Sequence, residues 1–112
     1  MSLVPEQAAF LLDTCKLIAF ATEQGFVVTT GEGWRSIEQQ KIYVETGRSK
    51  TMNSNHGRRL AHDYNFFLDG ELCYDKAKLA PIGAYWESLN PKNRWGGNFK
   101  SLVDVPHFER NV

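Results

Sequence analysis

Two histidines and two aspartates are spaced so that they could bind a metal ion and activate water. His56 precedes Asp63 within the stretch SNHGRRLAHD, and Asp104 precedes His107 within SLVDVPHFE. Two neutral imidazoles and one carboxylate form a donor set that suits zinc and leaves a coordination position open. Asp104 would then be a carboxylate near enough to act as a general base toward water. The pattern is therefore compatible with metal-dependent hydrolysis.

Simpler explanations of these residues remain open on spacing alone. On a regular strand, side chains three or seven positions apart point to opposite faces. Pro106 favours a bulge that would let Asp104 and His107 converge, and the glycine and arginines after His56 place that residue in a loop. Without a metal, Asp63 would cap a turn and His107 would be a half-buried histidine bonded to backbone.

Length and composition exclude several classes of protein. A chain of 112 residues is expected to form one domain, residues 1–112, whose hydrophobic core is stable without disulfides or structural metals. A formal net charge of zero argues against nucleic acid or an anionic membrane as partner. The chain has no signal-peptide pattern and no apolar run of the roughly 20 residues that span a membrane. We expect a monomer made in the cytoplasm, with Cys15 and Cys73 as reduced, buried thiols.

In the first half of the chain, the elements that must position these residues are helices and a short strand. Apolar spacings of three and four predict a helix over 5–24. Its expected core face consists of Ala8, Leu11, Leu12, Cys15, Ile18 and Ala19. The β-branched residues 26–30 predict a strand. Ser36 as a cap and Gly47 as a stop predict a second helix over 36–46, followed by a polar loop over 48–56.

The second half of the chain predicts a small sheet and one more helix. Residues 61–74 read as a β-hairpin that turns on Asp69 and Gly70. A helix with one apolar face is expected over 81–89, with Pro81 near its start. That face would consist of Ile82, Tyr85, Trp86 and Leu89. Residues 90–98 read as a loop and 101–109 as an edge strand. The expected fold class is α+β with a small antiparallel sheet flanked by helices.

Several motifs of the chain occur in an order that resembles a known family. They are GWRSIEQQKIYVETGRSK, the pair Ser54-x-His56 and Ala61-x-Asp63, RWGGNF, and Asp104-x-x-His107-Phe108. This order resembles the M15 zinc peptidases of bacterial cell walls. That family contains D-alanyl-D-alanine carboxypeptidases and dipeptidases, and L-alanyl-D-glutamate endopeptidases that serve many bacteriophages as endolysins. The resemblance extends over about residues 26 to 109, and an ordered set of motifs is more specific than any single one.

The resemblance implies a role for each candidate residue. The zinc ligands would be His56, Asp63 and His107. Asp104 would be the catalytic base, and Arg35 would contact the substrate and stabilise the oxyanion that develops on its carbonyl. Ser54 would be a supporting, substrate-binding residue. The implied fold is the α+β one shared by D-alanyl-D-alanine peptidases and the Hedgehog signalling domain.

The implied function is zinc-dependent hydrolysis of the peptidoglycan stem peptide, foremost as an L-alanyl-D-glutamate endopeptidase of the endolysin type. Such an enzyme would act on the cell wall after its release from the cytoplasm. Two alternatives stay open: a D-alanyl-D-alanine carboxypeptidase or dipeptidase, and a non-catalytic cell-wall-binding domain of the same fold. A binding domain would have no need of a base such as Asp104.

One position departs from the family pattern. The family usually has glycine three residues after its first histidine, whereas this chain has Arg59 there and Gly57 earlier. We expect the turn to be rearranged, with Arg59 either reaching the substrate or lying in solvent.

Overall fold

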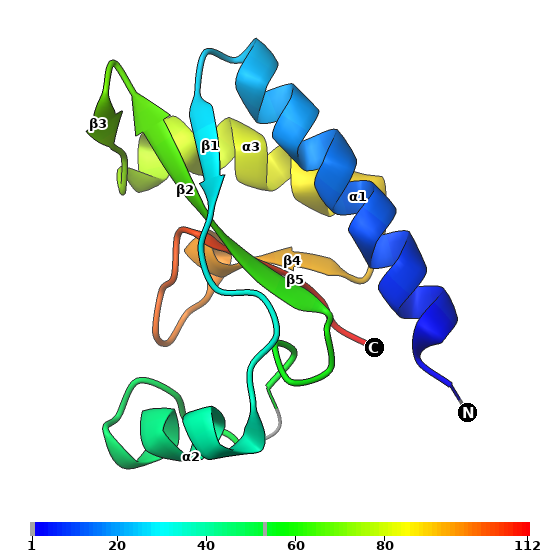
Figure 1. Cartoon of the computed structure of the whole chain (residues 1–112). Coiled ribbons are helices and arrows are strands. Elements are labelled where there is room, and N and C mark those ends of the chain that lie inside the picture. Colours follow the sequence, from blue (N-terminus) through cyan, green and yellow to red (C-terminus); the bar gives the residue numbers. More distant parts are fainter. Residues whose placement is uncertain (1, 53) are drawn as a thin grey trace.

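Three α-helices and five short strands form an α+β fold in residues 2–52 and 54–112, which the computed structural model describes (Figure 1). The predicted fold class is therefore confirmed; residue 53 of the predicted loop lies outside the described residues. The elements are α1 (Val4–Glu23), β1 (Val27–Thr30), α2 (Ile37–Glu45), β2 (Ala61–Leu68), β3 (Glu71–Leu72), α3 (Lys76–Leu89), β4 (Asn93–Trp95), the 3-10 turn Gly96–Asn98, and β5 (His107–Arg110). Within these ranges, no helix is long and apolar enough for a membrane span.

Strand β2 is the centre of an antiparallel sheet with the order β1-β2-β5-β4. Its residues 64–67 pair with β1, and its residues 61–63 pair with β5. At its far end β2 continues into β3 through a tight turn, where Asp69 and Gly70 have φ values of 52° and 80°. Two successive positive φ values characterise the turn that matches strand twist, so the predicted hairpin is confirmed.

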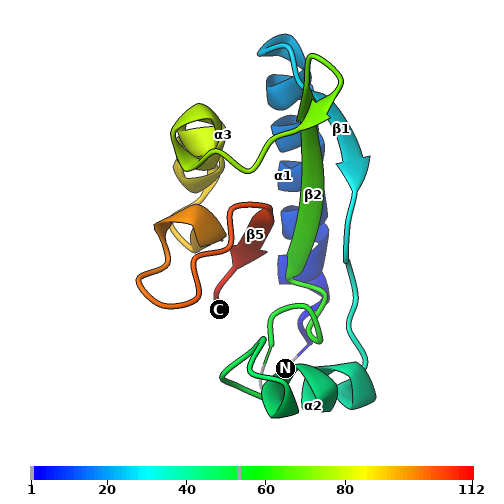
Figure 2. The same ribbon diagram turned by 90° about the vertical axis from the view of Figure 1, so that its left-hand side faces the viewer.

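Helices α1 and α3 lie together against one face of this sheet (Figure 2). Alternation along the strands sends Tyr64, Phe66 and Phe108 into the core between the sheet and the helices. Trp86 from α3 meets Phe108 edge-to-face, with their ring centroids 6.0 Å apart. The opposite face of β2 and β5 is left to the polar residues that form the candidate site.

The core-facing side of α1 differs from the predicted one. The exposed residues are Ala8, Leu11, Leu12, Cys15 and Ala19, while the buried ones are Phe10, Asp13, Thr14, Leu17 and Ala21. The inward side packs Phe10, Leu17 and Ala21 into the hydrophobic core. On this same side Arg110 Nη2 donates to Asp13 Oδ2 at 2.6 Å and Asn93 Nδ2 donates to it at 3.1 Å, so the buried Asp13 has partners. The expectation of a buried Cys15 is accordingly wrong.

Helix α3 begins earlier than predicted. Asp75 caps it by accepting hydrogen bonds from the amides of Ala77 and Lys78, so Pro81 lies inside the helix rather than at its start. Pro81 is exposed, while Ile82 and Trp86 on the predicted apolar face are fully buried. Burial of that face stabilises the helix despite the backbone hydrogen bond that proline cannot donate.

The C-terminal part of the sheet also differs from prediction. Residues 93–95, expected in a loop, form β4, and Trp95 pairs with Phe108 of β5. Strand β5 covers only His107–Arg110, because the chain before it makes a turn in which the His107 amide donates to Asp104 O at 3.1 Å. Pro106 therefore lies in a turn before the strand and not in a bulge within it.

Close packing of Trp95 on α3 yields the first testable prediction. A Cβ added at Gly83 would lie 2.2 Å from the Trp95 ring, which is itself buried. We expect Gly83→Ala to lower the free energy of unfolding by about 1–3 kcal/mol, although alanine is the better helix former. Chemical denaturation measures this change. Ala84→Gly, at the exposed neighbouring position, reports helix propensity alone; a Gly83→Ala variant as stable as the wild type would contradict the packing argument.

Candidate metal centre and substrate cleft

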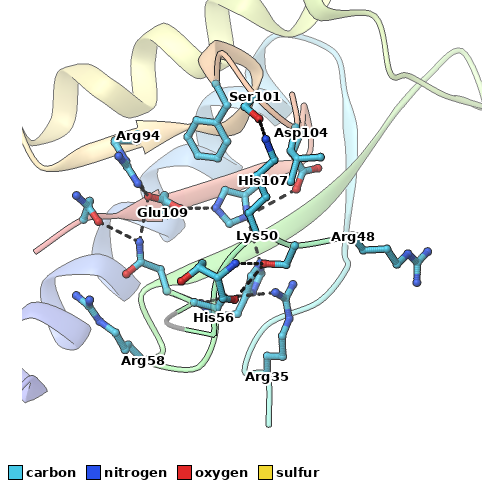
Figure 3. Close-up of a pocket in the computed structure, with 17 residues that line it drawn as sticks. Arg35, Arg48, Lys50, His56, Arg58, Arg94, Ser101, Asp104, His107 and Glu109 are labelled. Carbon is cyan, nitrogen blue, oxygen red and sulfur yellow. Dashed lines mark hydrogen bonds and ion pairs between the residues drawn. The ribbon is translucent and has the colours of Figure 1, made fainter. Parts of the chain in front are cut away.

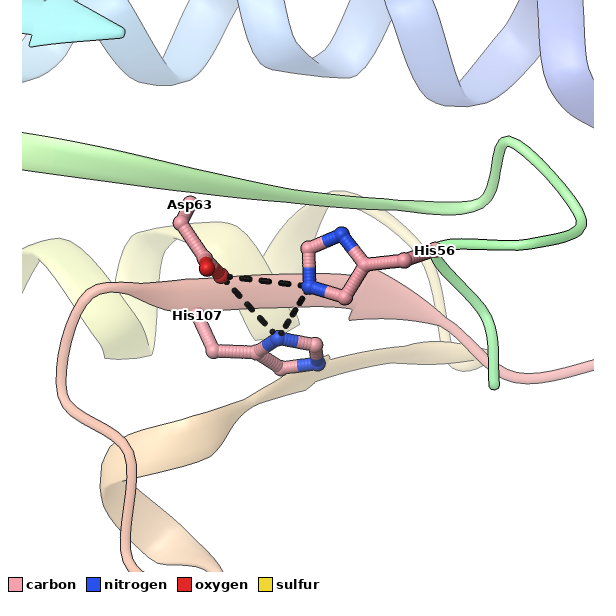
Figure 4. Close-up of side chains that lie close together, drawn as sticks. All are labelled: His56, Asp63 and His107. Atoms are coloured by element: carbon pink, nitrogen blue, oxygen red, sulfur yellow. Dashed lines mark hydrogen bonds and ion pairs between the residues drawn. The ribbon is translucent and has the colours of Figure 1, made fainter. Parts of the chain in front are cut away.

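Pairing of β2 with β5 brings two of the predicted ligands together. Asp63 and His107 are direct partners across the two antiparallel strands, so their side chains project from the same face of the sheet. Asp63 Oδ1 lies 3.2 Å from His107 Nδ1 (Figure 4). Strand register thus brings Asp63 and His107 together although they are 44 residues apart in the chain.

His56 reaches the same point from the turn that precedes β2. The amide of Leu60 donates to Asn55 O at 2.9 Å, which closes this turn. The His56 side chain is buried, and its Nε2 lies 3.3 Å from Asp63 Oδ1 and 3.1 Å from His107 Nδ1. The structure therefore brings together all three residues that the sequence singles out as candidate ligands.

The three atoms form a triangle that fits a metal ion. Its edges of 3.1, 3.2 and 3.3 Å compare with about 3.3–3.4 Å for a tetrahedral site whose ligands lie at 2.0–2.1 Å. The outer ring nitrogens also have partners. His56 Nδ1 lies 2.7 Å from Gly33 O, and His107 Nε2 lies 2.7 Å from Glu109 Oε1. An outer nitrogen that donates a hydrogen bond leaves the inner one with a free lone pair for a metal.

Electrostatics link Asp63 to both imidazoles. Burial opposes ionisation of Asp63, yet hydrogen bonds to His107 and His56 hold the pKa of this carboxyl below its ordinary value. Burial alone would lower the pKa of His107, but hydrogen bonds to Asp63 and Glu109 raise it to about 9. Asp63 is therefore ionised at neutral pH, and a metal ion competes with a proton for His107.

Asp104 stands beside the triangle on the turn before β5. Its Oδ2 lies 3.9 Å from His107 Nδ1, and its side chain is about half exposed to the cleft. Partial burial, together with the charge of Asp63, raises the pKa of Asp104 above its ordinary value. Gly96 holds this turn close, because the Asp104 amide donates to Gly96 O at 2.9 Å and a Cβ at Gly96 would lie 2.1 Å from Asp104 O. A carboxylate in this position can accept a proton.

Arg35 lines the cleft from the other side and is held in place. Its Nη1 donates to Gln40 Oε1 at 2.7 Å and to Ser54 Oγ at 3.3 Å, and its Nε donates to the Glu32 carboxylate. The guanidinium carbon lies 4.5 Å above the ring centroid of Tyr43. Its side chain is only 12% exposed, so it is not a solvated surface arginine. Ser54 Oγ also accepts the amide of His56 at 3.1 Å, which joins Arg35 to the metal triangle.

The cleft lined by His56 and His107 has a volume of about 350 Å³, and most of its charged lining residues are cationic (Figure 3). Ligand-binding clefts commonly measure about 300–1,000 Å³. Its charged lining residues other than the histidines are Arg35, Arg48, Lys50, Arg58, Arg94, Asp104 and Glu109. Since the whole chain carries a formal net charge of zero, this surplus of positive charge is local and suits an anionic ligand.

Of the other polar residues near the site, the sequence predicted the orientation of one and did not reveal the role of three. His62 points away as predicted, since its ring stacks on Tyr64 with centroids 4.6 Å apart. Sequence reasoning missed Glu32, Gln40 and Glu109. A usable signal existed for Glu109, because residues two apart on a strand share a face and Glu109 follows His107 by two. No pattern in the sequence marks the contacts of Glu32 or Gln40.

Arg59 adopts the conformation for which glycine is suited. Its φ is 59°, in the left-handed region, and its guanidinium carbon lies 5.2 Å from the Trp34 ring centroid. Arg59 is absent from the described lining of the cleft. Of the two expected alternatives, the exposed Arg59 side chain lies in solvent over Trp34 and not in the cleft. Arginine here occupies a left-handed position that glycine would take without strain.

A stability comparison tests this strain. We expect Arg59→Gly to be more stable than Arg59→Ala by about 1 kcal/mol, because both variants remove the contact with Trp34 while only glycine relieves the left-handed backbone. Equilibrium denaturation of the two variants measures the difference. Equal stabilities would mean that the turn imposes no strain at this position.

Comparison with known proteins places these motifs in a family. A family model for D-alanyl-D-alanine carboxypeptidase matches residues 47–110. The L-alanyl-D-glutamate peptidase of Listeria phage A118 is 30% identical over 86% of this chain and 34% of its own length. The crystal structure of the L-Ala D-Glu endopeptidase ChiX from Serratia marcescens is similar with a TM-score of 0.70 and 27% identity, covering 88% of this chain and 78% of that one.

The chain thus spans about a third of the length of the phage relative. The match to the family model takes in more than half of the chain, including the metal triangle and Asp104. The fold is similar over most of both structures. This chain therefore belongs to the M15 peptidase family.

Proposed function

We propose that this chain is a zinc peptidase that hydrolyses the stem peptide of bacterial peptidoglycan, with L-alanyl-D-glutamate endopeptidase specificity. One observation carries the proposal: both imidazoles of the metal-compatible triangle, a carboxylate base and an anchored arginine line one cleft, and Asp63 lines the adjoining pocket together with Arg35 and Asp104. A structural metal site would be closed by protein ligands and would need neither a base nor an adjoining cleft. Retention of both Asp104 and Arg35 also argues against a purely binding domain.

The proposed zinc ligands are His56 Nε2, Asp63 Oδ1 and His107 Nδ1. Two neutral imidazoles and one carboxylate leave one unit of positive charge on the centre, which favours an electrophilic role. Zinc, when bound, supplies Lewis acidity that polarises a carbonyl and acidifies water. Hydrogen bonds to Gly33 and Glu109 hold the two rings in the orientation that this binding requires.

Asp104 is the proposed general base. It accepts a proton from the attacking water and delivers that proton to the leaving amine, so no covalent intermediate with the protein is needed. In the metal-free protein, burial and the charge of Asp63 raise the pKa of Asp104, and a carboxylate with a higher pKa is a stronger proton acceptor. Arg35 donates hydrogen bonds to the carbonyl oxygen as negative charge develops on it. Glu32, Gln40 and the other partners of Arg35 keep it oriented before substrate arrives.

The names of the relatives and the charge of the cleft support the proposed specificity. Both the phage relative and the Serratia structure are named for the bond between L-alanine and D-glutamate. A substrate with the carboxylates of a stem peptide complements the basic side chains around the cleft. The phage source of one relative favours an endolysin-type role at the cell wall. The family description favours a second candidate, removal of a terminal D-alanine.

Substitution of the proposed base separates catalysis from metal binding. We expect Asp104→Asn to keep about one zinc per chain while peptidoglycan hydrolysis falls by about 100-fold or more, since general-base catalysis contributes about 10²–10⁴-fold. Elemental analysis and release of soluble wall peptides measure the two quantities. His56→Ala is the matched control and should lose both zinc and activity. Undiminished turnover in Asp104→Asn would show that another group is the base.

Digestion products distinguish the two specificities. Purified sacculi incubated with the zinc-loaded protein should release whole stem peptides that begin with D-glutamate, as identified by mass spectrometry. Release of free D-alanine with the stem left on the glycan would instead support the carboxypeptidase. If the zinc-loaded protein leaves all stem peptides intact, the proposed function is wrong.

A further inference from the structure

We propose that Glu109 is the positioning residue of the metal centre: it keeps the proton of His107 on Nε2 and thereby leaves Nδ1 free to bind the metal. This inference rests on the proposed metal site but not on the proposed substrate. Glu109 follows His107 by two positions on β5, so both side chains project from one face of the strand. Its Oε1 lies 2.7 Å from His107 Nε2 (Figure 3), whereas Asp63 lies near the other ring nitrogen, Nδ1.

The second oxygen of Glu109 is occupied by cationic and amide donors. Arg94 Nε donates to Oε2 at 2.8 Å, Arg94 Nη2 donates to the same oxygen, and Asn55 Nδ2 donates at 3.0 Å. The Glu109 residue is 5% exposed, whereas the side chain of Arg94 is 50% exposed. The partners of Oε2 stabilise the ionised carboxylate in this buried position.

An ionised carboxylate can only accept hydrogen bonds, and this property determines which nitrogen of His107 carries hydrogen. Because Oε1 of Glu109 faces Nε2, Nε2 must be the donor. With a metal in the triangle, Asp63 would bind the metal instead of accepting from Nδ1, and Nδ1 of the neutral ring would present its lone pair to the metal beside Asp63 and His56. A carboxylate that orients a metal-binding imidazole typically changes metal affinity about 10–100-fold when it is removed.

Glu109→Gln should therefore weaken zinc binding, although glutamine has nearly the same shape as glutamate. The side-chain oxygen of glutamine would take the place of Oε2, where Arg94 and Asn55 present three donor hydrogens. The amide nitrogen would then face His107 and donate to Nε2. That contact favours the other tautomer, in which Nδ1 carries hydrogen and cannot bind a metal.

Zinc affinity of two variants tests this inference. We expect Glu109→Gln to bind zinc about 10–100-fold more weakly than the wild type in competition with a chromogenic chelator at constant pH. Arg94→Met is the matched control, because it removes the ion pair but keeps the carboxylate; its affinity should stay within about fivefold of the wild type. If the two variants bind zinc equally well, the proposal is overturned. Circular dichroism of both variants confirms that they are folded.

A second measurement needs no variant at all. Long-range proton–nitrogen NMR spectra of the zinc-loaded wild type should show His107 with hydrogen on Nε2 and with Nδ1 shifted by the metal. Hydrogen on Nδ1, or zinc on Nε2, would overturn the proposal even if Glu109→Gln fails to fold. Neither experiment contains peptidoglycan. A protein that passes both tests but cleaves no stem peptide would refute the proposed function and leave the role of Glu109 intact.

Discussion

Antiparallel pairing of β2 with β5 is the constraint on which the site depends. This pairing sets Asp63 opposite His107, and a slip of one residue would send one of the two side chains into the core. The register is secured on the other edge of β2 as well. There Gly31 donates to Asp63 O at 2.8 Å, and the Asp63 amide donates to Glu32 O at 2.7 Å. Both the amide and the carbonyl of Asp63 are thus hydrogen-bonded to the chain that follows β1 before its carboxylate meets any imidazole.

The same pairing divides buried charge between two faces of β5. Arg110 pairs with Asp13 under α1, while Glu109 pairs with Arg94 beside the cleft. Each ionised group thereby has a partner, as burial of charge requires. The first pair joins the chain ends into one core, and the second supports His107. Strand β5 therefore carries residues that stabilise the core as well as residues of the site. Any variant on β5 needs a folding control before a loss of activity is interpreted.

Local sequence patterns predicted elements well where a cap or a turn is encoded by neighbouring residues. Ser36 accepts the amide of Gln39 at the start of α2 as expected, and Asp69-Gly70 forms the hairpin turn. The predictions were wrong where contacts between residues far apart in the sequence determine the structure. The inward side of α1 carries Asp13, whose burial is possible because Arg110, a partner 97 residues away, pairs with it. Strand β4 forms because it pairs with β5, and three residues are too few to show the alternation that would predict a strand.

The types and order of the site residues can be read from the amino-acid sequence: two histidines and an aspartate that could bind zinc, and a further aspartate beside them. It could not decide whether these side chains converge, because strand alternation alone separates residues three or seven apart. Their convergence depends on long-range contacts: strand register brings Asp63 and His107 together, and turns bring His56 and Asp104 to them. The supporting contacts of Arg35 and Glu109 also belong to the tertiary structure. They join side chains that no local periodicity relates.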